Sequence, residues 1–517
     1  MCVSFSTVLS ASVVGLKVEL VHVEADVSNG LPAFHMVGYL SSEVREASER
    51  VRTAIRNSGL VYPPGKTVIN LSPATVKKKG AAFDLPIAVS ILISLGQIRQ
   101  QKAENILIVG ELGLDGRILK VPAILPIVSE AKEKGINCCL IPRENAQEGA
   151  LVEGMSVIGV ETLCEAAGYL NGRYTIEPTQ YRRIDEEETT DGESLDYSDI
   201  CGQAAVKRAT EVAVAGGHNL LLVGPPGSGK SMTAKRIPTI FPPMTYEESM
   251  EITKVYSIRG MVDSERPLIQ KRPFRSVHHT ASKTALVGGG IVPLPGEISL
   301  AHEGVLFLDE LPEFSKNVLE VLRQPLEEKK IGIARSHGIY QFPANFMLVG
   351  AMNPCPCGCY PDRSRCVCTP GQIQHYMGKL SSPFLDRIDI CVEAPKVEYE
   401  ALRGKNREES SAAIRERVCR ARDIQKSRYR ELGISTNSML GMRELEKYCV
   451  LGKKEEELMK QAFSRLGLTA RTYHKMLKVA RTIADLEGAQ QIGSEHLMEA
   501  LSYRSFDRTY GGQSYGV

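Results

Sequence analysis

The stretch GGHNLLLVGPPGSGKS, residues 216–231, decides the fold of the region around it. Its apolar residues Leu220 to Val223 predict a short buried strand, and the glycine-rich segment that follows matches GxxxxGKS at every fixed position. Glycines let the backbone turn until its N–H groups converge on phosphate oxygens, at the positive end of the next helix. The loop comprises Gly224, Pro225, Pro226, Gly227, Ser228, Gly229, Lys230 and Ser231. We therefore expect a nucleotide-binding loop rather than an ordinary turn.

The side chains that would act on ATP come from this loop and from a second apolar strand, GVLFLDE, over residues 304–310. Lys230 would reach the β and γ phosphates, and the Ser231 hydroxyl would hold Mg²⁺. Asp309 can hold Mg²⁺ through water, while Glu310 can orient and deprotonate the attacking water. An Asp-Glu pair at a strand end is common by itself. Downstream of a phosphate loop, it predicts hydrolysis of ATP.

The composition is that of an ordinary globular protein, with 43% hydrophobic and 24% charged residues among 517. The 63 basic and 61 acidic side chains leave a net charge of +2, so any contact with nucleic acid must come from local patches. The longest nearly apolar run, Leu85 to Gly96, is too short to span a membrane, and no positive residue precedes Lys17 as a secretory signal would require. We therefore expect a cytoplasmic protein with no membrane partner.

Residues 1–180 are predicted to form an α+β domain. Apolar and polar residues nearly alternate from Leu16 to Asp26, which is the period of a half-buried strand, and helical spacing follows from Glu43 to Asn57. The segment from Asp185 to Asp199 then holds eight acidic residues and no Lys or Arg. It predicts a flexible linker over residues 181–198, although such a run could instead bind a basic partner.

Three segments of this domain resemble the Lon-type proteolytic domain, over most of residues 15–136. They begin GLKVELVHVEADVSNG, INLSPATVKKKGAAFD and VGELGLDGRILKVPAIL. The chemistry of that family needs a nucleophilic serine after the glycine of KKKG and a lysine in the later helix to activate it. Alignment on these motifs places Ala82 and Leu125 at the two positions. The resemblance therefore implies the Lon-like fold without peptidase activity.

The rest of the chain resembles the AAA+ ATPases, and specifically their magnesium-chelatase-like branch. The resemblance rests on GGHNLLLVGPPGSGKS, RPFRSVHHTAS, PGEISLAHEGVLFLDELPEF, LRQPLEE, AMNPCPCG, LDRIDI and LKVARTIADL. It implies that Asn353 positions the attacking water, that Arg387 is a finger inserted into a neighbour's site, and that Arg471 senses the γ-phosphate from the lid. From the residues alone, Asn353 could cap a turn, Arg387 could pair with Asp386, and Arg471 could act in cis or in trans. A finger supplied in trans requires a ring, so we expect a homo-hexamer.

Two elements of this core resemble parts that grip DNA in related ring motors. Residues 275–302 form a glycine-rich excursion that matches the helix-2 insert of this branch, and residues 329–342 predict a hairpin that turns at Ser336 to Gly338. In those motors both elements project into the central pore, where basic side chains bind a phosphate backbone without reading its sequence. The hairpin offers Lys329, Lys330, Arg335 and His337. A charged hairpin on a protein surface is otherwise more often simply solvated.

Thirteen cysteines are present, and five of them lie between Cys355 and Cys368. That pattern suits a reducing cytoplasm with one local thiol site better than a disulfide framework. Two Cys-x-Cys pairs, Cys355 with Cys357 and Cys366 with Cys368, could close a tetrahedral thiolate site around a structural Zn²⁺. Cys359 is a fifth thiol, which leaves the choice of the four ligands open. Buried, inert cysteines fit poorly because the surrounding residues are Pro, Gly, Asp, Arg and Ser.

The expected fold class is α/β: a Lon-protease-like α+β N-terminal domain, an AAA+ phosphate-loop core over residues 199–399, and an α-helical C-terminal lid over residues 400–517. The resemblance implies an ATP-dependent hexameric helicase that promotes branch migration during recombination of incoming DNA in natural transformation. The alternative is a metal-chelatase-type motor or a protein-remodelling ATPase. The cysteine loop and the Lon-like domain favour the helicase, and a proteolytic or binding-only role comes third.

Overall fold

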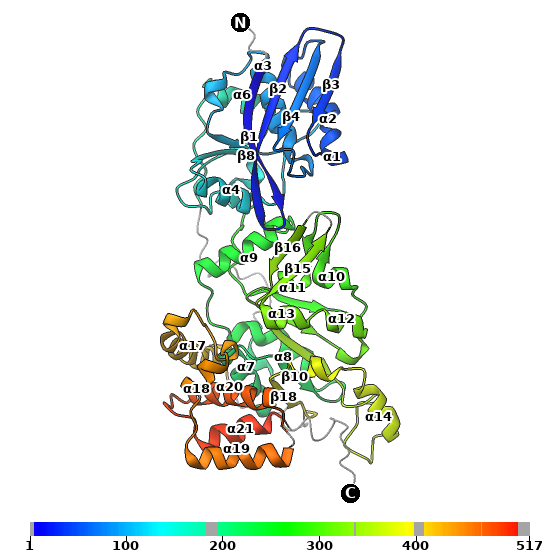
Figure 1. Cartoon of the computed structure of the whole chain (residues 1–517), viewed down its shortest axis with the longest axis vertical. Coiled ribbons are helices and arrows are strands. Elements are labelled where there is room, and N and C mark those ends of the chain that lie inside the picture. Colours follow the sequence, from blue (N-terminus) through cyan, green and yellow to red (C-terminus); the bar gives the residue numbers. More distant parts are fainter. Residues whose placement is uncertain (1–4, 182–194, 336–337, 398–407, 467, 505–517) are drawn as a thin grey trace.

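The computed structural model describes residues 5–181, 195–335, 338–397, 408–466 and 468–504. Most of the predicted acidic linker, His337 and the residues after Arg504 therefore lie outside the described part. Figure 1 shows an elongated chain in which an N-terminal unit, a phosphate-loop core and a group of C-terminal helices follow one another along the long axis.

The N-terminal unit is built on a seven-stranded mixed sheet in the order β3-β4-β2-β1-β5-β8-β9. Its strands are β1 Phe5–Val14, β2 Lys17–Ser28, β3 Ala33–Val37, β4 Lys66–Ser72, β5 Ile106–Ile108, β8 Cys138–Pro142 and β9 Ser156–Val160, with a small hairpin of β6 Glu111–Leu112 and β7 Ile118–Leu119. Its helices are α1 Ser42–Arg45, α2 Ala47–Asn57, α3 Asp84–Ser94, α4 Ile124–Glu133, α5 Ala146–Gly149 and α6 Leu163–Leu170.

Apolar side chains of this sheet point to both of its faces and form a hydrophobic core on each. In β5, Leu107 belongs to the core that includes α4, and Ile108 belongs to the core that includes α2, α3 and α6. Successive strand residues point to opposite faces, so helices cover both faces at this end of the sheet. The strand predicted from Leu16 to Asp26 is confirmed by β2, which pairs antiparallel with β1 and with β4. The helix predicted from Glu43 to Asn57 is divided at Glu46 into α1 and α2.

Helix α3 is the buried centre of the N-terminal unit, and its first residue is a buried carboxylate. All of its residues are buried. Arg50 of α2 donates from Nε and Nη2 to the two carboxylate oxygens of Asp84, at 2.7 and 3.0 Å. Burial raises the pKa of Asp84, and the hydrogen bond from Arg50 opposes that rise. The pair therefore ties α2 to α3 through a charge that needs its partner.

The core contains a five-stranded sheet in the order β11-β14-β17-β10-β18, and every pairing within it is parallel. The strands are β10 Leu220–Val223, β11 Phe274–Val277, β14 Val305–Leu308, β17 Met347–Met352 and β18 Ile390–Glu393. The helices are α7 Ala204–Gly216, α8 Lys230–Arg236, α9 Tyr246–Ile258, α10 Lys283–Val287, α11 Glu297–Leu300, α12 Lys316–Glu320, α13 Arg323–Glu328, α14 Pro370–Met377 and α15 Ser382–Leu385. Two hairpins leave the core, β12 Gly288–Gly289 with β13 Leu294–Pro295, and β15 Lys330–Arg335 with β16 Gly338–Pro343.

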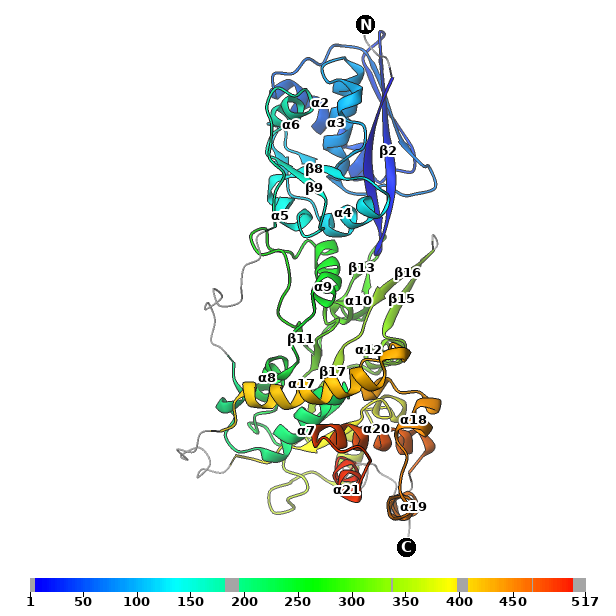
Figure 2. The same ribbon diagram turned by 90° about the vertical axis from the view of Figure 1, so that its left-hand side faces the viewer.

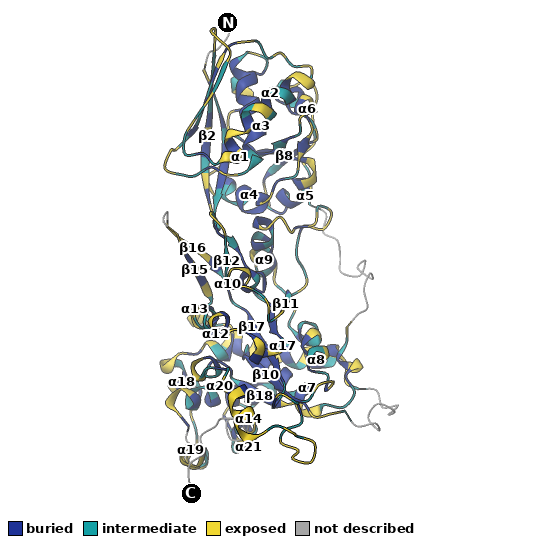
Figure 3. Cartoon of the chain, turned by 90° about the vertical axis from the view of Figure 1, so that its right-hand side faces the viewer, coloured by how far each residue is buried: buried dark blue, intermediate teal, exposed yellow. Residues whose placement is uncertain are grey.

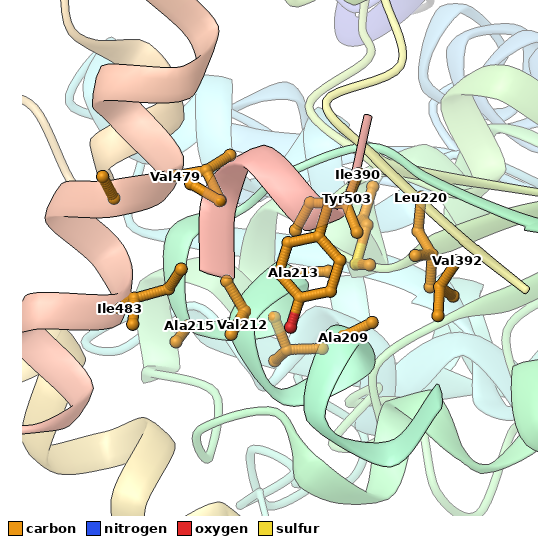
Figure 4. Close-up of a cluster of buried hydrophobic side chains, with 14 of the residues drawn as sticks. Ala209, Val212, Ala213, Ala215, Leu220, Ile390, Val392, Val479, Ile483 and Tyr503 are labelled. Carbon is orange, nitrogen blue, oxygen red and sulfur yellow. The ribbon is translucent and has the colours of Figure 1, made fainter. Parts of the chain in front are cut away.

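The C-terminal region is helical, as expected. It contains α17 Ser411–Arg428, α18 Met442–Tyr448, α19 Lys453–Leu466, α20 Ala470–Leu486 and α21 Ser494–Ser502. Helices α17 and α20 both pack on α7. Figure 4 shows Val479 and Ile483 of α20 beside Val212 and Ala215 of α7, within a cluster that also holds strand residues of the core. None of the helices in the described ranges is long and apolar enough to cross a membrane.

The N-terminal unit rests on the core through helix α9 and through a hairpin. Helix α4 packs on α9, and the Ala123 N–H donates to the Ser257 carbonyl at 2.9 Å. On the other side, the turn between β1 and β2 reaches the β15–β16 hairpin, as Figure 2 shows. A Cβ atom at Gly15 in that turn would lie 3.3 Å from the Tyr340 ring. The two units therefore meet at two separate places.

We predict that Arg50→Ala destabilises the N-terminal unit by about 3–5 kcal/mol, because the buried carboxylate of Asp84 loses its cationic partner and keeps only a long hydrogen bond from the Leu112 N–H. The free energy of unfolding at neutral pH, measured by chemical denaturation, tests this. Arg117→Ala is a matched control because Arg117 pairs with Asp115 in solvent, and it should change little. Equal losses from the two variants would contradict the prediction.

Candidate nucleotide and metal sites

The carboxyl ends of the core strands meet at one edge of the sheet, and the predicted nucleotide-binding groups follow those ends. Val223 at the end of β10 is level with Met352 at the end of β17. The phosphate loop begins at Gly224, directly after β10, and Asn353 directly follows β17. Asp309 directly follows β14, which lies next to β17. The parallel register thus brings together groups that are far apart in the sequence.

The phosphate loop has the shape that its glycines predict. Gly227 and Gly229 have positive φ angles of 76° and 83°, and a side chain at either position would meet no protein atom within 4 Å. Gly224 is needed for a different reason, since a Cβ atom there would lie 2.2 Å from the Ala394 carbonyl oxygen. The loop backbone is therefore held against β18 at its start and faces open space at its turn, where phosphate groups fit.

Lys230 opens helix α8, and its ammonium group lies inside the phosphate loop. It donates to the carbonyls of Gly224 and Pro225 at 2.7 and 2.9 Å and to Asn353 Oδ1 at 3.3 Å. Burial lowers the pKa of Lys230, and the nearby Asp309 carboxylate opposes that change. A phosphate group would therefore find a partly desolvated cation already in place.

The hard oxygen ligands that Mg²⁺ prefers lie together between the loop and β14. The Ser231 hydroxyl donates to Asp309 Oδ2 at 2.7 Å, and the backbone N–H of Glu310 donates to Asp309 Oδ1 at 2.9 Å. This donor set fits Mg²⁺. Glu310 itself has a left-handed backbone with φ 52°, and its Oε2 lies 3.3 Å from Nδ1 of His279.

The five cysteines that follow Asn353 are free thiols, and four of them converge. The Sγ atoms of Cys355, Cys357, Cys366 and Cys368 all lie within 4.8 Å of one another. Cys355 Sγ is 3.3 Å from Cys357 Sγ and 3.8 Å from Cys366 Sγ. Four thiolates around Zn²⁺ at about 2.3 Å would be separated by about 3.8 Å, so these four residues fit the metal.

Cys359 lies apart from this group, with its thiol against the Cys357 carbonyl at 3.7 Å. A hydrogen bond from the Cys359 backbone N–H is the main cause that lowers the pKa of the Cys357 thiol, whereas the pKa values of the neighbouring Cys366 and Cys368 thiols are raised. The geometry therefore separates the four candidate ligands from the fifth thiol, which the sequence alone did not do.

The cysteine loop packs against the phosphate loop. Gly358 lies so close to the phosphate loop that a Cβ atom there would be 2.4 Å from Cδ of Pro226. A cavity of about 1060 Å³ lies between the cysteine loop, helix α14 and the strand ends. Its lining includes Asp309, Glu310, Asn353, Cys357, His375 and Tyr376.

The two predicted arginines lie together on one carboxylate. Arg387 Nη2 donates to Glu327 Oε1 at 2.7 Å, and Arg471 Nη2 donates to the same oxygen. Arg387 therefore pairs with Glu327 rather than with the neighbouring Asp386. The Arg387 side chain is only 7% exposed, whereas Arg471 is half-exposed.

The hairpin β15–β16 and the insert lie side by side, and many residues of the hairpin are exposed (Figure 3). Arg335 donates from Nε to the Gly290 carbonyl of the insert at 3.2 Å. Lys330 is exposed at the base of the hairpin. Lys329 follows helix α13 with a left-handed backbone of φ 56°, and its carbonyl accepts from the Ala344 N–H at 2.9 Å at the base of the hairpin. Burial lowers the pKa of Lys329, and its contact with DNA stays a prediction. His337 lies outside the described residues.

Sequence reasoning missed two polar residues at these sites, His279 and Glu327. A signal for His279 was present, because it closely follows β11, and β11 is the parallel neighbour of β14, the strand that directly precedes Asp309. Residues that follow adjacent parallel strands meet at the same sheet edge. No comparable signal pointed to Glu327, since its partners come from segments remote in sequence.

Comparison with known families agrees with this geometry. The family model for magnesium chelatase subunit ChlI matches residues 196–402. Separate models for subunit ChlI of Mg-chelatase and for the ChlI C-terminal region match residues 23–145 and 408–504. Lon protease 2 of Bacillus subtilis is 28% identical over 201 residues, covering 33% of this chain and 35% of that protein. This likeness agrees with the Lon-like fold expected for the N-terminal unit.

Two relatives align along nearly the whole chain. Competence protein ComM of Haemophilus influenzae is 42% identical over 98% of both chains. The uncharacterized protein YifB of Salmonella typhimurium is 41% identical over 98% of both chains. Both alignments thus span the Lon-like N-terminal fold, the AAA+ core with its phosphate loop and the helical C-terminal region. The chain belongs to the magnesium-chelatase-like AAA+ ATPase family, in its ComM/YifB type.

Proposed function

We propose that this protein is an ATP-dependent AAA+ motor that acts on DNA. The observation that carries the hydrolytic part is the convergence of Lys230, Ser231, Asp309, Glu310 and Asn353 at one edge of the core sheet. The family implies ATP and Mg²⁺ as ligands, and the donor sets described above fit both. When bound, Mg²⁺ would supply charge neutralisation on the phosphate oxygens.

In this proposal the protein groups divide the work of hydrolysis. Lys230 binds the phosphates, and Ser231 with Asp309 holds the metal. Asn353, which already contacts Lys230, orients the attacking water, and Glu310 takes its proton. His279 stands beside the Glu310 carboxylate and limits where it can point.

We further propose a homo-hexamer in which Arg387 acts on the nucleotide of the neighbouring subunit. The site within one chain has a lysine and two carboxylates but no arginine among the described contacts of the phosphate loop. A finger arginine is worth about a thousandfold or more in rate, so subunit contact would control hydrolysis.

DNA is the proposed substrate because the β15–β16 hairpin carries two exposed basic side chains, Lys330 at its base and Arg335 near its tip, and Arg335 also contacts the insert at Gly290. The name of the relative ComM refers to competence, which supports branch migration during recombination of incoming DNA. A metal-chelatase or protein-remodelling motor is the second candidate, favoured by the family models named for magnesium chelatase.

The proposed domain organisation is a Lon-like domain over 1–180, a linker over 181–198, the AAA+ core over 199–399 and a lid over 400–517. The extents of the three family models support it. In the N-terminal domain, Ala82 and Leu125 offer only hydrocarbon side chains, so we propose a scaffold rather than a peptidase. The free thiols of the cysteine loop support a cytoplasmic location.

Glu310→Gln should bind ATP normally but hydrolyse it about a hundredfold more slowly or worse, because the amide cannot accept the proton of water. Lys230→Ala should instead lose tight nucleotide binding. Nucleotide binding by fluorescence and phosphate release measure the two effects separately. Glu313→Gln is the control, since Glu313 is a nearby exposed carboxylate paired with Lys379. Turnover by Glu310→Gln at the wild-type rate would remove the proposed base.

One Zn²⁺ per chain should be found in protein purified anaerobically without chelator. The double variant Cys366→Ser, Cys368→Ser should lose the metal, whereas Cys359→Ser should keep it, because Cys359 lies outside the group of four. Elemental analysis of the three proteins decides the matter. A wild-type preparation without stoichiometric metal would exclude the site.

Reversing the charge of Lys330 and Arg335 to Glu should weaken DNA binding similarly for all sequences. The salt dependence of the binding constant should become shallower by about one unit per lost phosphate contact. Basal hydrolysis of ATP should be nearly unchanged because both residues lie away from the strand ends. The double variant Lys454→Glu, Lys460→Glu, at two exposed positions of α19, makes the same change in net charge and is the control. An unchanged salt slope would rule out this surface.

A further inference from the structure

One carboxylate oxygen joins three segments of the chain. Glu327 Oε1 accepts hydrogen bonds from Arg387, in the loop between α15 and β18, and from Arg471, in the first turn of α20. Glu327 itself lies in α13. The contact therefore links the core helix before the hairpin, the proposed finger and the proposed lid sensor.

The two guanidinium groups depend on this carboxylate. Both guanidinium groups carry a permanent positive charge, so they repel each other when they bind the same carboxylate. Burial is the main cause that lowers the pKa of Arg387, and the positive charge of the neighbouring Arg471 lowers it further. Glu327 opposes that effect. Without it, two cations would face each other with no anion between them.

Arg387 is withdrawn into the protein in this arrangement. Its side chain is 7% exposed, Nη1 donates to the Pro383 carbonyl, and Nε is buried with no hydrogen-bond partner among the described residues. A finger that reaches a neighbouring nucleotide must be extended, and a buried unpaired donor favours leaving such a position. In this arrangement the Arg387 side chain is therefore largely enclosed by its own chain.

Helix α13 connects this contact to the hairpin. Glu327 is one residue from the end of α13, Lys329 makes a left-handed turn, and β15 begins at Lys330. Helix α13 also packs on β15. A force on the hairpin therefore acts on Glu327 through only a few residues of ordered backbone.

We propose that Glu327 is a positioning residue that holds Arg387 and Arg471 in the resting position and releases them together when DNA occupies the β15–β16 hairpin. The inference rests on the proposed function of Arg387 and on the γ-phosphate sensing that the family resemblance implies for Arg471, so that both arginines act on a phosphate. The shared oxygen explains why the two would act as a pair: each competes for the same anion, and a phosphate offers several oxygens in its place.

The test compares Glu327→Gln with Glu328→Gln, which changes the adjacent exposed carboxylate on the same helix. Glu327→Gln should raise hydrolysis without DNA by about fivefold, the factor expected for the loss of a half-exposed charged contact. Stimulation by DNA should fall correspondingly, with the effect in kcat and little change in KM for ATP. Glu327→Asp should retain stimulation by DNA, and Glu328→Gln should behave as wild type.

A second readout uses the nucleotide-free protein, so that it does not depend on hydrolysis. If the contact exists at rest, Glu327→Gln and Arg471→Ala should lower the melting temperature non-additively, the double variant losing no more than the larger single variant. Additive losses would overturn the proposal. So would slower hydrolysis by Glu327→Gln, or unchanged stimulation by DNA in that variant. If wild type hydrolyses ATP but ignores DNA, the DNA-motor function fails and release by DNA fails with it, while the non-additivity still tests the resting contact.

Discussion

The parallel hydrogen bonding of β10 between β17 and β18 is the constraint on which the candidate site depends. Leu220 to Val223 pair with Val349 to Met352 on one side and with Ile390 to Glu393 on the other. The backbone hydrogen bonds between these strands fix the position, along the strand direction, at which three chain segments leave the sheet. The phosphate loop, Asn353 and the strand that follows Arg387 are consequently held in one frame, and none can shift along the sheet without breaking backbone hydrogen bonds.

Two further contacts attach other parts of the molecule to this frame. Gly358 brings the cysteine loop against Pro226 of the phosphate loop, so an ordered metal site would brace the nucleotide site. Lys475 of α20 lies 3.2 Å from Asp389, and the Asn219 N–H donates to the same carboxylate at 3.0 Å. The C-terminal helices are therefore joined to the start of β10 through charged groups as well as through the apolar cluster of Figure 4.

The sequence was most informative where short local motifs identify the functional residues. The phosphate loop and the Asp309-Glu310 pair could be placed because each follows an apolar strand, and parallel strands bring such ends together. The choice among five cysteines could not be made, since Cys357 and Cys359 have similar spacing and differ only in where the loop turns them. Lys329 lies one residue before β15 because α13 continues to Glu328, an extent of helix that nothing local in the sequence indicated. Glu327 was missed because its contacts join helices that only tertiary packing brings together.

The backbone at Glu310 has a consequence for how this site can change. A φ of 52° raises the free energy of the folded state by about 1 kcal/mol for a residue with a side chain, but not for glycine. The chain thus keeps a carboxylate where the main chain alone would prefer glycine. A Glu310→Gly substitution relaxes the turn while removing the acid group. Backbone stability and turnover of ATP therefore oppose each other at this position.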